Sequence, residues 1–342
     1  MRRPSNNVFV RAAVPPSGPA HVRRREADAL IPSRSHAAIV IVNPKAGRGD
    51  GGSVARRAVD RLTTHGWDAE VLSTSRPGEA TALARDESSG ASLVVAVGGD
   101  GTASEVAEGL MSLDDRPAMA VVPAGSGCDL ARNLGIGGIE AGLDALEAGA
   151  TRDMDLGRIE LQGEDGAFSR YFVLTTGTGF SASVIRSATT RVKRLFRSKT
   201  YAVAGVLGAV RYRPPMMRWS VDGETGEGRV FNVVVSNAEI EAGGARMSPG
   251  ATAFDGKLWV AVWHGSSALA GLWRMRLIFG GSHVEHPAIT YTAGSVVTID
   301  SDPPVGIQVD GEVPGRTPAR FEVVPGALRV VVGQAPGLTR CP

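Results

Sequence analysis

The stretch VVAVGGDGTASEV (94–106) places an acidic side chain, Asp100, among three glycines at the end of an apolar run. Gly98, Gly99 and Gly101 have no Cβ, so a ligand can approach their backbone N–H groups closely. A helix that begins at such a turn attracts phosphate through its positive end. A carboxylate there repels phosphate by about 1 kcal/mol in water at about 4 Å, and by several times more in a partly buried cleft. Asp100 is therefore expected where Mg²⁺ stands between the protein and nucleotide phosphates.

The same turn lacks the spacing of two common phosphate motifs. GGDGT is not the G-x-G-x-x-G of a dinucleotide-binding fold, and no Gly-Lys-Ser/Thr of a P-loop follows it. Taken alone, it is also compatible with an ordinary strand-to-helix turn that carries an acid at the helix start. Thr102, followed three residues later by Glu105, has the form of a capping box, which predicts that the helix begins near Thr102.

Alternating strand and helix patterns place this turn in a parallel sheet. Between residues 37 and 150, an apolar strand, a turn and a helical segment follow one another about four times, with strands in 37–49 and at 69–74, 93–97 and 118–123. Continuous Val, Ile and Ala runs are typical of a parallel sheet that is covered on both faces. We therefore predict a doubly wound, mostly parallel α/β domain over 37–150, with its ligand at the carboxyl ends of the strands.

After about residue 151 the pattern changes to β-rich runs broken by Gly, Asp and Pro, which predicts an antiparallel second domain over 151–332. Helical patterns interrupt it at roughly 182–211 and 267–279. The cleft between two such domains is the natural place for an active site.

Three loops together carry a family resemblance. NPKAGRG (43–49), GGDGT (98–102) and PAGSGCDLAR (123–132), in this order and spacing, resemble the diacylglycerol kinase catalytic family, which includes bacterial lipid kinases and, more distantly, sphingosine and ceramide kinases. The resemblance extends from about residue 37 to 332 and implies ATP and Mg²⁺. The residues that it assigns to ATP are Asn43, Pro44, Lys45, Ala46, Gly47, Thr74, Gly98, Gly99, Asp100, Gly101, Thr102, Ala103, Ser104, Ser126 and Asp129.

The third loop departs from the family pattern at two positions. Ser126 stands where the family usually has threonine and keeps the hydroxyl, whereas Cys128 replaces the usual asparagine and removes a strong donor and acceptor. Asp129 is retained. Arg132 also matches, although an arginine in the first turn of a helix is as often simply solvated.

Two further stretches of the second domain match the family. VDGEVPGRTP (309–318) resembles its closing Asp-Gly-Glu motif, which implies Glu312 as general base and Asp310 as its catalytic partner; without the resemblance this stretch is simply a hairpin turn. SNAEIEAGGARMSPGATAFDGKLWV (236–260) resembles a stretch that implies a second, structural Mg²⁺ at Asp255 with main-chain oxygens of Thr252 and Lys257. Family members often have two adjacent acids here, and Phe254 occupies the first position.

Composition limits the remaining possibilities. The formal net charge of the 342 residues is +2, so the total charge indicates no nucleic-acid partner, and no apolar run is long enough to span a bilayer. Cys128 and Cys341 are placed where a disulfide is not expected, which favours a cytoplasmic protein. Residues 1–36 are expected to form a disordered basic arm and 333–342 a tail. A homodimer is compatible with the sequence.

The resemblance implies transfer of the ATP γ-phosphate to the primary hydroxyl of a diacylglycerol-like lipid, giving a phosphatidic-acid-type product. A sphingoid base or another lipid alcohol is the alternative substrate, and a catalytically inactive lipid-binding protein is a further alternative. NAD kinases share GGDGT, but the other loops match lipid kinases. RVKRLFRSK (191–199) and LWRMRLIF (272–279) mix cations with apolar residues, so they are expected either to contact the membrane surface or to pack in the core.

Overall fold

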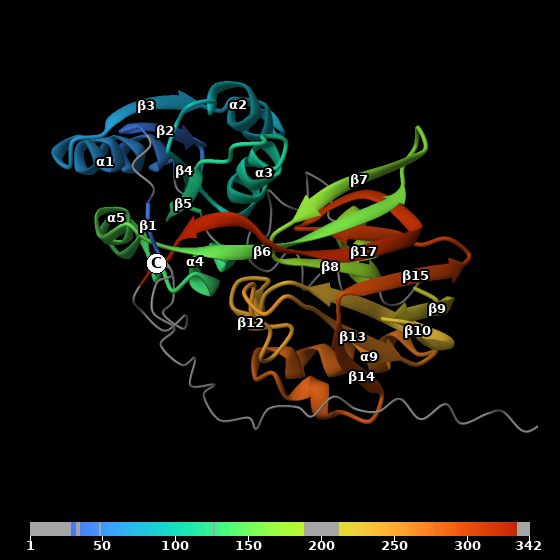
Figure 1. Cartoon of the computed structure of the whole chain (residues 1–342). Helices are drawn as coiled ribbons and strands as arrows, with labels where there is room; N and C mark the ends of the chain where they lie inside the picture. The colour runs from blue at the N-terminus through green and yellow to red at the C-terminus, as the bar shows by residue number, and fades with distance from the viewer. Residues whose placement is uncertain (1–28, 32–34, 48, 126, 188–211, 334–342) are drawn as a thin grey trace, which may run out of the picture.

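The structure of the protein is a computed structural model that describes residues 29–31, 35–47, 49–125, 127–187 and 212–333. The segment 191–199 and Ser126, both singled out from the sequence, lie outside these residues. Figure 1 shows a first domain in which helices surround a small sheet and a second domain built mainly of strands. Among the described residues, no helix is long and apolar enough to cross a membrane.

The first domain contains the predicted parallel sheet. Its strands lie in the order β3 (Asp68–Ser73), β2 (Ala37–Val42), β4 (Leu93–Gly98) and β5 (Ala118–Pro123), and all neighbours are parallel. Every residue of β4 and β5 is buried, whereas the edge strand β3 is largely exposed. The helices are α1 (Gly51–Thr64), α2 (Glu79–Glu87), α3 (Asp100–Leu110), α4 (Asp129–Asn133) and α5 (Ile139–Ala148). Helix α1 packs beside α5 and α2 beside α3, so both faces of the sheet are covered (Figure 1).

The second domain is β-rich and antiparallel, as the sequence predicts. Its strands are β6 (Ala150–Gln162), β7 (Ala167–Phe172), β8 (Thr175–Gly179), β9 (Met216–Val221), β10 (Glu224–Ser236), β11 (Ile240–Glu241), β12 (Ala245–Arg246), β13 (Leu258–His264), β14 (Ile289–Gly294), β15 (Val296–Asp302), β16 (Gly306–Val309) and β17 (Glu312–Val331). Short helices α6 (Phe180–Ser187), α9 (Ala268–Met275), η2 (Arg276–Phe279) and η3 (Ser282–Glu285) lie between them. Alternate strand residues, including Phe172, Val233 and Phe321, form a separate apolar core.

Strands β6 and β17 join the two domains. They pair antiparallel along most of their length, and β17 also pairs in parallel with β5, where Val330 lies opposite Met119. Met154, Leu156 and Leu328 consequently belong to the core of the first domain. The sheet thus continues from one domain into the other, which the sequence did not reveal.

Two expectations about local structure were wrong. Ala29 and Leu30 form β1, which pairs with β6, so the last part of the segment 1–36 is not a disordered arm. Helix α3 begins at Asp100, close to the expected Thr102, but the expected capping box is absent, because no side chain caps this helix. Glu105 instead accepts hydrogen bonds from the N–H groups of Gly78 (2.9 Å) and Ala80 (3.1 Å), and it thereby caps the neighbouring helix α2, whose N-cap is a glycine.

Candidate active site

Three glycine-containing loops meet at the carboxyl ends of β2, β4 and β5. Gly47 lies against the Ala124 carbonyl oxygen with a φ of 61°, and any Cβ there would clash with that oxygen. The Gly125 Cα packs against Gly99, and Ala124 N–H donates to Gly98 O at 2.8 Å. The absence of side chains is therefore what allows these loops to pack together, in addition to leaving their backbone accessible.

Asn43 and Thr74 lie at the same edge of the sheet. The Asn43 side-chain oxygen accepts from Lys45 N–H at 3.0 Å, which turns the segment Asn43–Gly47 back toward the sheet. Thr74 directly follows β3, and its N–H donates to Val42 O at 2.9 Å. The structure thus brings 43–47, Thr74 and the GGDGT turn to adjacent strand ends, as the alternating pattern predicts.

Asp100 is the first residue of α3 and is partly buried. Its Oδ1 accepts from Leu130 N–H at 2.9 Å, which ties the GGDGT turn to α4. Its Oδ2 faces Gly127, where a Cβ would come within 2.8 Å of that oxygen. Oδ2 accepts no hydrogen bond from the described residues, so this oxygen can bind Mg²⁺ directly or through water, and the side chain fits the predicted role.

Asp129 is buried at the start of α4 and links the two domains. Its Oδ2 accepts from Gly243 N–H of the second domain at 2.7 Å, and its Oδ1 pairs with Arg132, which is itself buried. Burial raises the pKa of the Asp129 carboxyl, and the nearby Asp100 carboxylate acts in the same direction. Of the two readings left open for Arg132, the buried ion pair therefore holds and the solvated side chain does not.

Asp310 occupies the turn between β16 and β17, and Asp310 and Gly311 both have positive φ, 43° and 91°. This is the geometry of a two-residue type I′ hairpin. Its carboxylate accepts four hydrogen bonds: from Ser104 Oγ (2.9 Å) and from the N–H groups of Val173 (2.9 Å), Leu174 (3.1 Å) and Thr175 (3.1 Å). Burial raises the pKa of Asp310, and these bonds oppose that rise. The stretch that resembles the family's Asp-Gly-Glu motif is therefore also a hairpin turn.

Glu312, two residues later, has a different environment. Its side chain is 59% exposed, and one carboxylate oxygen pairs with Arg170 Nη1 at 3.1 Å. Arg170 belongs to β7, and Glu108 of α3 accepts from the N–H of the next residue, Tyr171, at 2.7 Å. Burial raises the pKa of Glu108, and the positive charge of Arg170 opposes the rise. Arg170 therefore lies between acids of both domains, and no pattern in the sequence indicates it.

Glu241 is a second residue that the sequence did not indicate. It lies in β11, in the loop that meets α4: Asn133 Nδ2 donates to Ile240 O at 2.9 Å, and Ile240 N–H donates to Asn133 Oδ1 at 3.2 Å. Burial raises the pKa of Glu241 to about 7, and the Asp310 and Asp129 carboxylates contribute to the rise. Glu241 is therefore close enough to Asp129 and Asp310, which both make contacts between the domains, to be influenced by their charges.

The residues expected to hold a second Mg²⁺ lie at another place in the second domain. Asp255 Oδ1 accepts from Lys257 N–H and its Oδ2 from Trp259 Nε1, each at 3.0 Å. Burial raises the pKa of Asp255, and the neighbouring Asp155 carboxylate adds to this. The carboxylate retains lone pairs for a cation, but its hydrogen bonds already form an ordinary turn. The described residues contain no group of three or more His, Cys, Asp or Glu side chains that could hold a metal.

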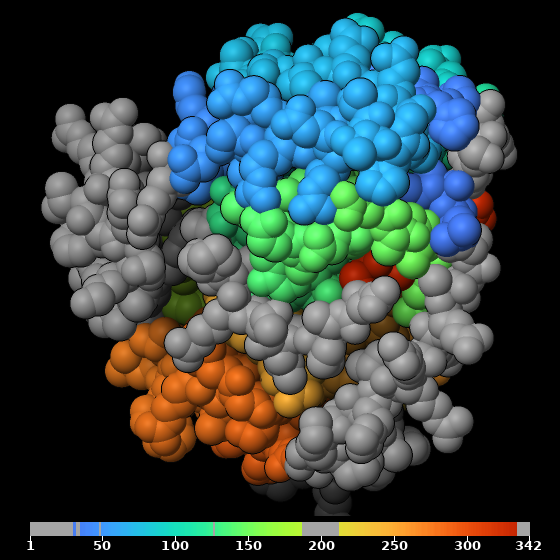
Figure 2. All heavy atoms as spheres, turned by 90° about the vertical axis from the view of Figure 1, so that its left-hand side faces the viewer, coloured from blue at the N-terminus to red at the C-terminus, as the bar shows by residue number. Residues whose placement is uncertain are grey.

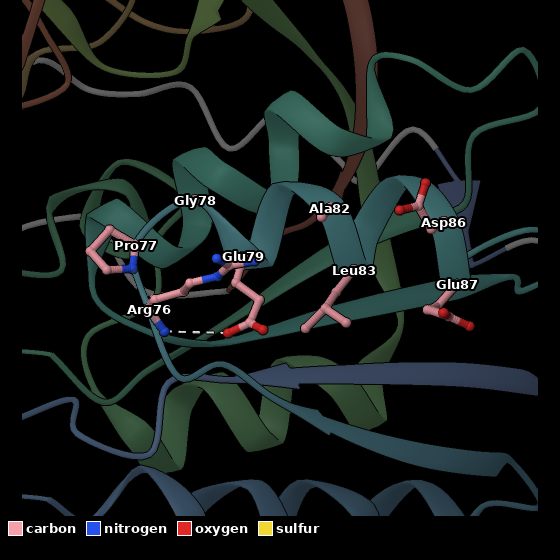
Figure 3. A pocket seen from close by; sticks show the side chains of 8 residues that line it. All are labelled: Arg76, Pro77, Gly78, Glu79, Ala82, Leu83, Asp86 and Glu87. Atoms are coloured by element: carbon pink, nitrogen blue, oxygen red, sulfur yellow. Dashed lines mark hydrogen bonds between the residues drawn. The ribbon is translucent and has the colours of Figure 1, made fainter.

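A surface hollow of about 400 Å³ lies away from these side chains, on the exposed side of α2. Figure 3 shows its lining: Arg76, Pro77, Gly78, Glu79, Ala82, Leu83, Asp86 and Glu87. Arg76 N–H donates to Glu79 at 3.3 Å across one end. The lining carries three acids and one cation and includes no predicted site residue, so it has no evident part in phosphate binding.

Comparison with known proteins identifies the two domains. Residues 37–159 match the diacylglycerol kinase catalytic domain, and residues 175–332 match the YegS C-terminal NAD kinase beta sandwich-like domain. A diacylglycerol kinase of Bacillus subtilis is 25% identical over 82% of this chain and 91% of its own length. A diacylglycerol kinase of Mycobacterium tuberculosis is 28% identical over 85% of this chain and 93% of its own.

A solved structure from Bacillus anthracis shares the fold. It superimposes with a TM-score of 0.73 and covers 87% of this chain and 95% of its own, at 23% identity. The two matched domains and the full-length relatives agree with the three loops on which the sequence resemblance rests. Residues 37–159 therefore match a diacylglycerol kinase catalytic domain, and the chain resembles bacterial diacylglycerol kinases along most of its length.

Proposed function

We propose that this protein transfers the γ-phosphate of ATP to the primary hydroxyl of a diacylglycerol-like lipid and releases a phosphatidic-acid-type product. The active site lies between the proposed domains 37–150 and 151–332. The proposal further places the protein in the cytoplasm, associated peripherally with a membrane, where such a substrate resides.

The observation that carries this proposal is the contact between the GGDGT helix and the Asp-Gly-Glu hairpin. Ser104 Oγ of α3 donates to Asp310 Oδ2, although the two residues are 206 positions apart. The hairpin that contains Glu312 is thereby held against the helix that begins at Asp100. A base and a phosphate-binding turn on facing domains are what transfer to a bound alcohol requires.

In the proposed site, nucleotide phosphates bind to the backbone N–H groups of the glycine loops and to the positive end of α3. The loop residues 43–47, Thr74, 98–104, Ser126 and Asp129 surround the nucleotide. Asp100 holds Mg²⁺, which when bound offsets the charge on the phosphates. Asp255, with Thr252 and Lys257, is proposed to hold the second, structural Mg²⁺.

Glu312 is the proposed general base for the lipid hydroxyl. A primary alcohol has a high pKa, so the base need only accept the proton late in the transfer, while positioning provides most of the rate. Arg170 restrains the exposed Glu312 carboxylate through their 3.1 Å ion pair. Asp310 supports the site by fixing the hairpin, because its four accepted hydrogen bonds leave little capacity for a proton.

A panel assay tests the reaction and the choice of lipid. Radiolabelled ATP and Mg²⁺ are supplied with diacylglycerol, sphingosine, ceramide or another lipid alcohol in mixed micelles, and with NAD as a soluble acceptor. We expect label in the diacylglycerol product, and none with Asp100→Ala. Preferential labelling of a sphingoid base or another lipid alcohol would replace the proposed substrate, whereas ATP and lipid binding without any transfer would identify an inactive homologue.

A further inference from the structure

Helix α9 and the turn η2 expose a group of large apolar side chains. Leu269, Trp273 and Phe279 are 64%, 58% and 67% exposed, and they are the three most exposed large hydrophobic residues among the described residues of the second domain. Leu269 and Trp273 are four positions apart and so lie on the same face of α9. The Arg276 guanidinium lies over the Trp273 ring, 3.4 Å from its centre. We call Leu269, Trp273, Arg276 and Phe279 the α9 patch.

The opposite side of α9 is fixed in the core. Gly271 lies directly on the Phe231 ring, where any Cβ would clash, and Ala268 is buried. Leu272 and Met275 are partly buried against the same apolar cluster. The helix cannot turn its exposed face inward without losing these contacts, so the exposure of the α9 patch is a property of the fold.

Two arginines lie in the segment that carries the α9 patch. Residues 265–284 contain Arg274 and Arg276 but no Asp or Glu, and the next acid along the chain is Glu285, at the end of η3. Arg276 is exposed, whereas Arg274 donates to His264 O at 3.1 Å. Apolar and aromatic side chains beside an exposed cation suit the headgroup region of a bilayer that contains anionic lipid. A peptide partner would be expected to dock in a groove, and the hollow described beside α2 does not include this patch.

The position of the α9 patch agrees with a membrane as its partner. In Figure 2 the part of the chain around α9 and η2 (orange) lies at the opposite end of the molecule from the first strands and helices (blue). Phe231, which supports Gly271, stacks on Phe180 at 4.5 Å between ring centres. Phe180 directly follows β8, whose first residue, Thr175, donates to Asp310. The packing that holds the patch is thus continuous with the strand that holds the catalytic hairpin.

We propose that the α9 patch is the surface through which the protein enters the headgroup region of an anionic membrane. This inference rests on the proposed lipid kinase function, which explains why the protein would bind a membrane. The binding itself can be measured without any phosphoryl transfer.

Co-sedimentation of the full chain with vesicles tests the proposal. Vesicles of phosphatidylcholine alone are compared with vesicles that also contain phosphatidylglycerol, at low and high salt. We expect binding only with phosphatidylglycerol present, and weakening by salt. Trp273→Ala and Phe279→Ala should each lower partitioning by about tenfold, the effect of burying one large apolar side chain. Arg276→Gln should lower it by about fivefold, the effect of one cation near the surface.

Phe168→Ala is the matched control, because Phe168 is 38% exposed on β7 and lies outside the patch. It should bind vesicles as the unchanged protein does. Circular dichroism melting checks that every variant is folded. Unchanged vesicle binding by the patch variants would overturn the inference, and so would a self-association, seen in analytical ultracentrifugation, that Trp273→Ala abolishes while vesicle binding persists.

A water-soluble, short-chain diacylglycerol separates this inference from the proposed function. The patch variants should phosphorylate that substrate as fast as the unchanged protein and lose activity only on vesicle lipid. Absence of any phosphorylation, together with patch-dependent vesicle binding, would reject the kinase activity and retain the membrane surface. Normal phosphorylation, together with vesicle binding that does not depend on the patch, would retain the kinase activity and reject the membrane surface.

Discussion

The glycine loops of the first domain and the acidic hairpin of the second domain are built in different ways. Each glycine loop follows its own strand and leads into its own helix, so its motif consists of a few consecutive residues. The hairpin depends on distant partners, since Asp310 accepts from Ser104 and from three consecutive N–H groups near Val173. The comparison teaches that a local motif can be recognised from sequence, whereas the contacts of a site assembled across domains are found only in the structure.

The largest expected effect comes from the first of these regions. Asp100→Ala should reduce phosphoryl transfer by about 10³-fold or more, because it removes the carboxylate proposed to hold Mg²⁺ at the phosphates. The measurement is turnover at saturating Mg²⁺, with the fold checked by thermal melting. Asp114→Ala, at an exposed acid beyond the end of α3, is the control. Normal turnover of Asp100→Ala would remove this side chain from the mechanism.

The hairpin is tested by Glu312→Gln, which keeps the size of the side chain but cannot accept a proton. Lipid phosphorylation should fall by about 10²–10⁴-fold, the usual contribution of a general base. ATP affinity, followed by calorimetry, should hardly change, because the nucleotide loops belong to the other domain. Joint loss of ATP binding and turnover would show that the two regions are not separable in function. Unchanged turnover would leave the Asp-Gly-Glu stretch as a turn only.

Glu241 offers a pH-dependent test of how the acids near it affect its charge. Its pKa is raised from 4.5 to about 7, so the folded protein resists its ionisation more than the unfolded chain does. The charge on Glu241 therefore lowers the free energy of unfolding. This destabilisation is absent below about pH 4.5, grows as the pH rises, and is complete above about pH 7, at no more than about 3 kcal/mol. Glu241→Gln should remove this destabilisation.

The corresponding measurement is urea unfolding at pH 5 and pH 8 in EDTA. The gain in unfolding free energy for Glu241→Gln should be larger at pH 8 than at pH 5. Glu164→Gln, at an exposed position between β6 and β7, should show no such difference. An equal gain at both pH values would mean that Glu241 has no unfavourable charge to lose.

The smallest effect is expected for Cys128→Asn in the third glycine loop. Cys128 is buried with a φ of 55°, and its Sγ donates to Gly125 O at 3.2 Å. Asparagine adopts this left-handed conformation more readily than most residues and is the family's usual residue here. The variant should keep or raise activity and gain up to about 1 kcal/mol in unfolding free energy. Loss of activity, measured in the same micelles, would contradict the assigned role of this loop.

The sequence predicted the parallel sheet, the antiparallel second domain and the meeting of the three loops. These succeed because apolar periodicity and glycine turns act over a few residues. It did not predict the role of Glu105, whose spacing from Thr102 indicates a capping box but whose carboxylate reaches α2. Nor did it indicate Arg170 or Glu241, because each obtains its environment from contacts with segments far away in the sequence.

The paired strands β6 and β17 also determine how the molecule can deform. The chain enters the second domain along β6, which is paired with β17 over most of its length, so no single peptide acts as a swivel. Its register is interrupted between Val324 and Leu328, where Gly326 has a φ of 57° and donates to Asp155 Oδ1 at 2.8 Å. Bending is therefore easiest at this interruption. Any opening of the proposed active site is therefore expected to bend one continuous sheet, and the hydrogen bond from Gly326 N–H to Asp155 should resist that bending.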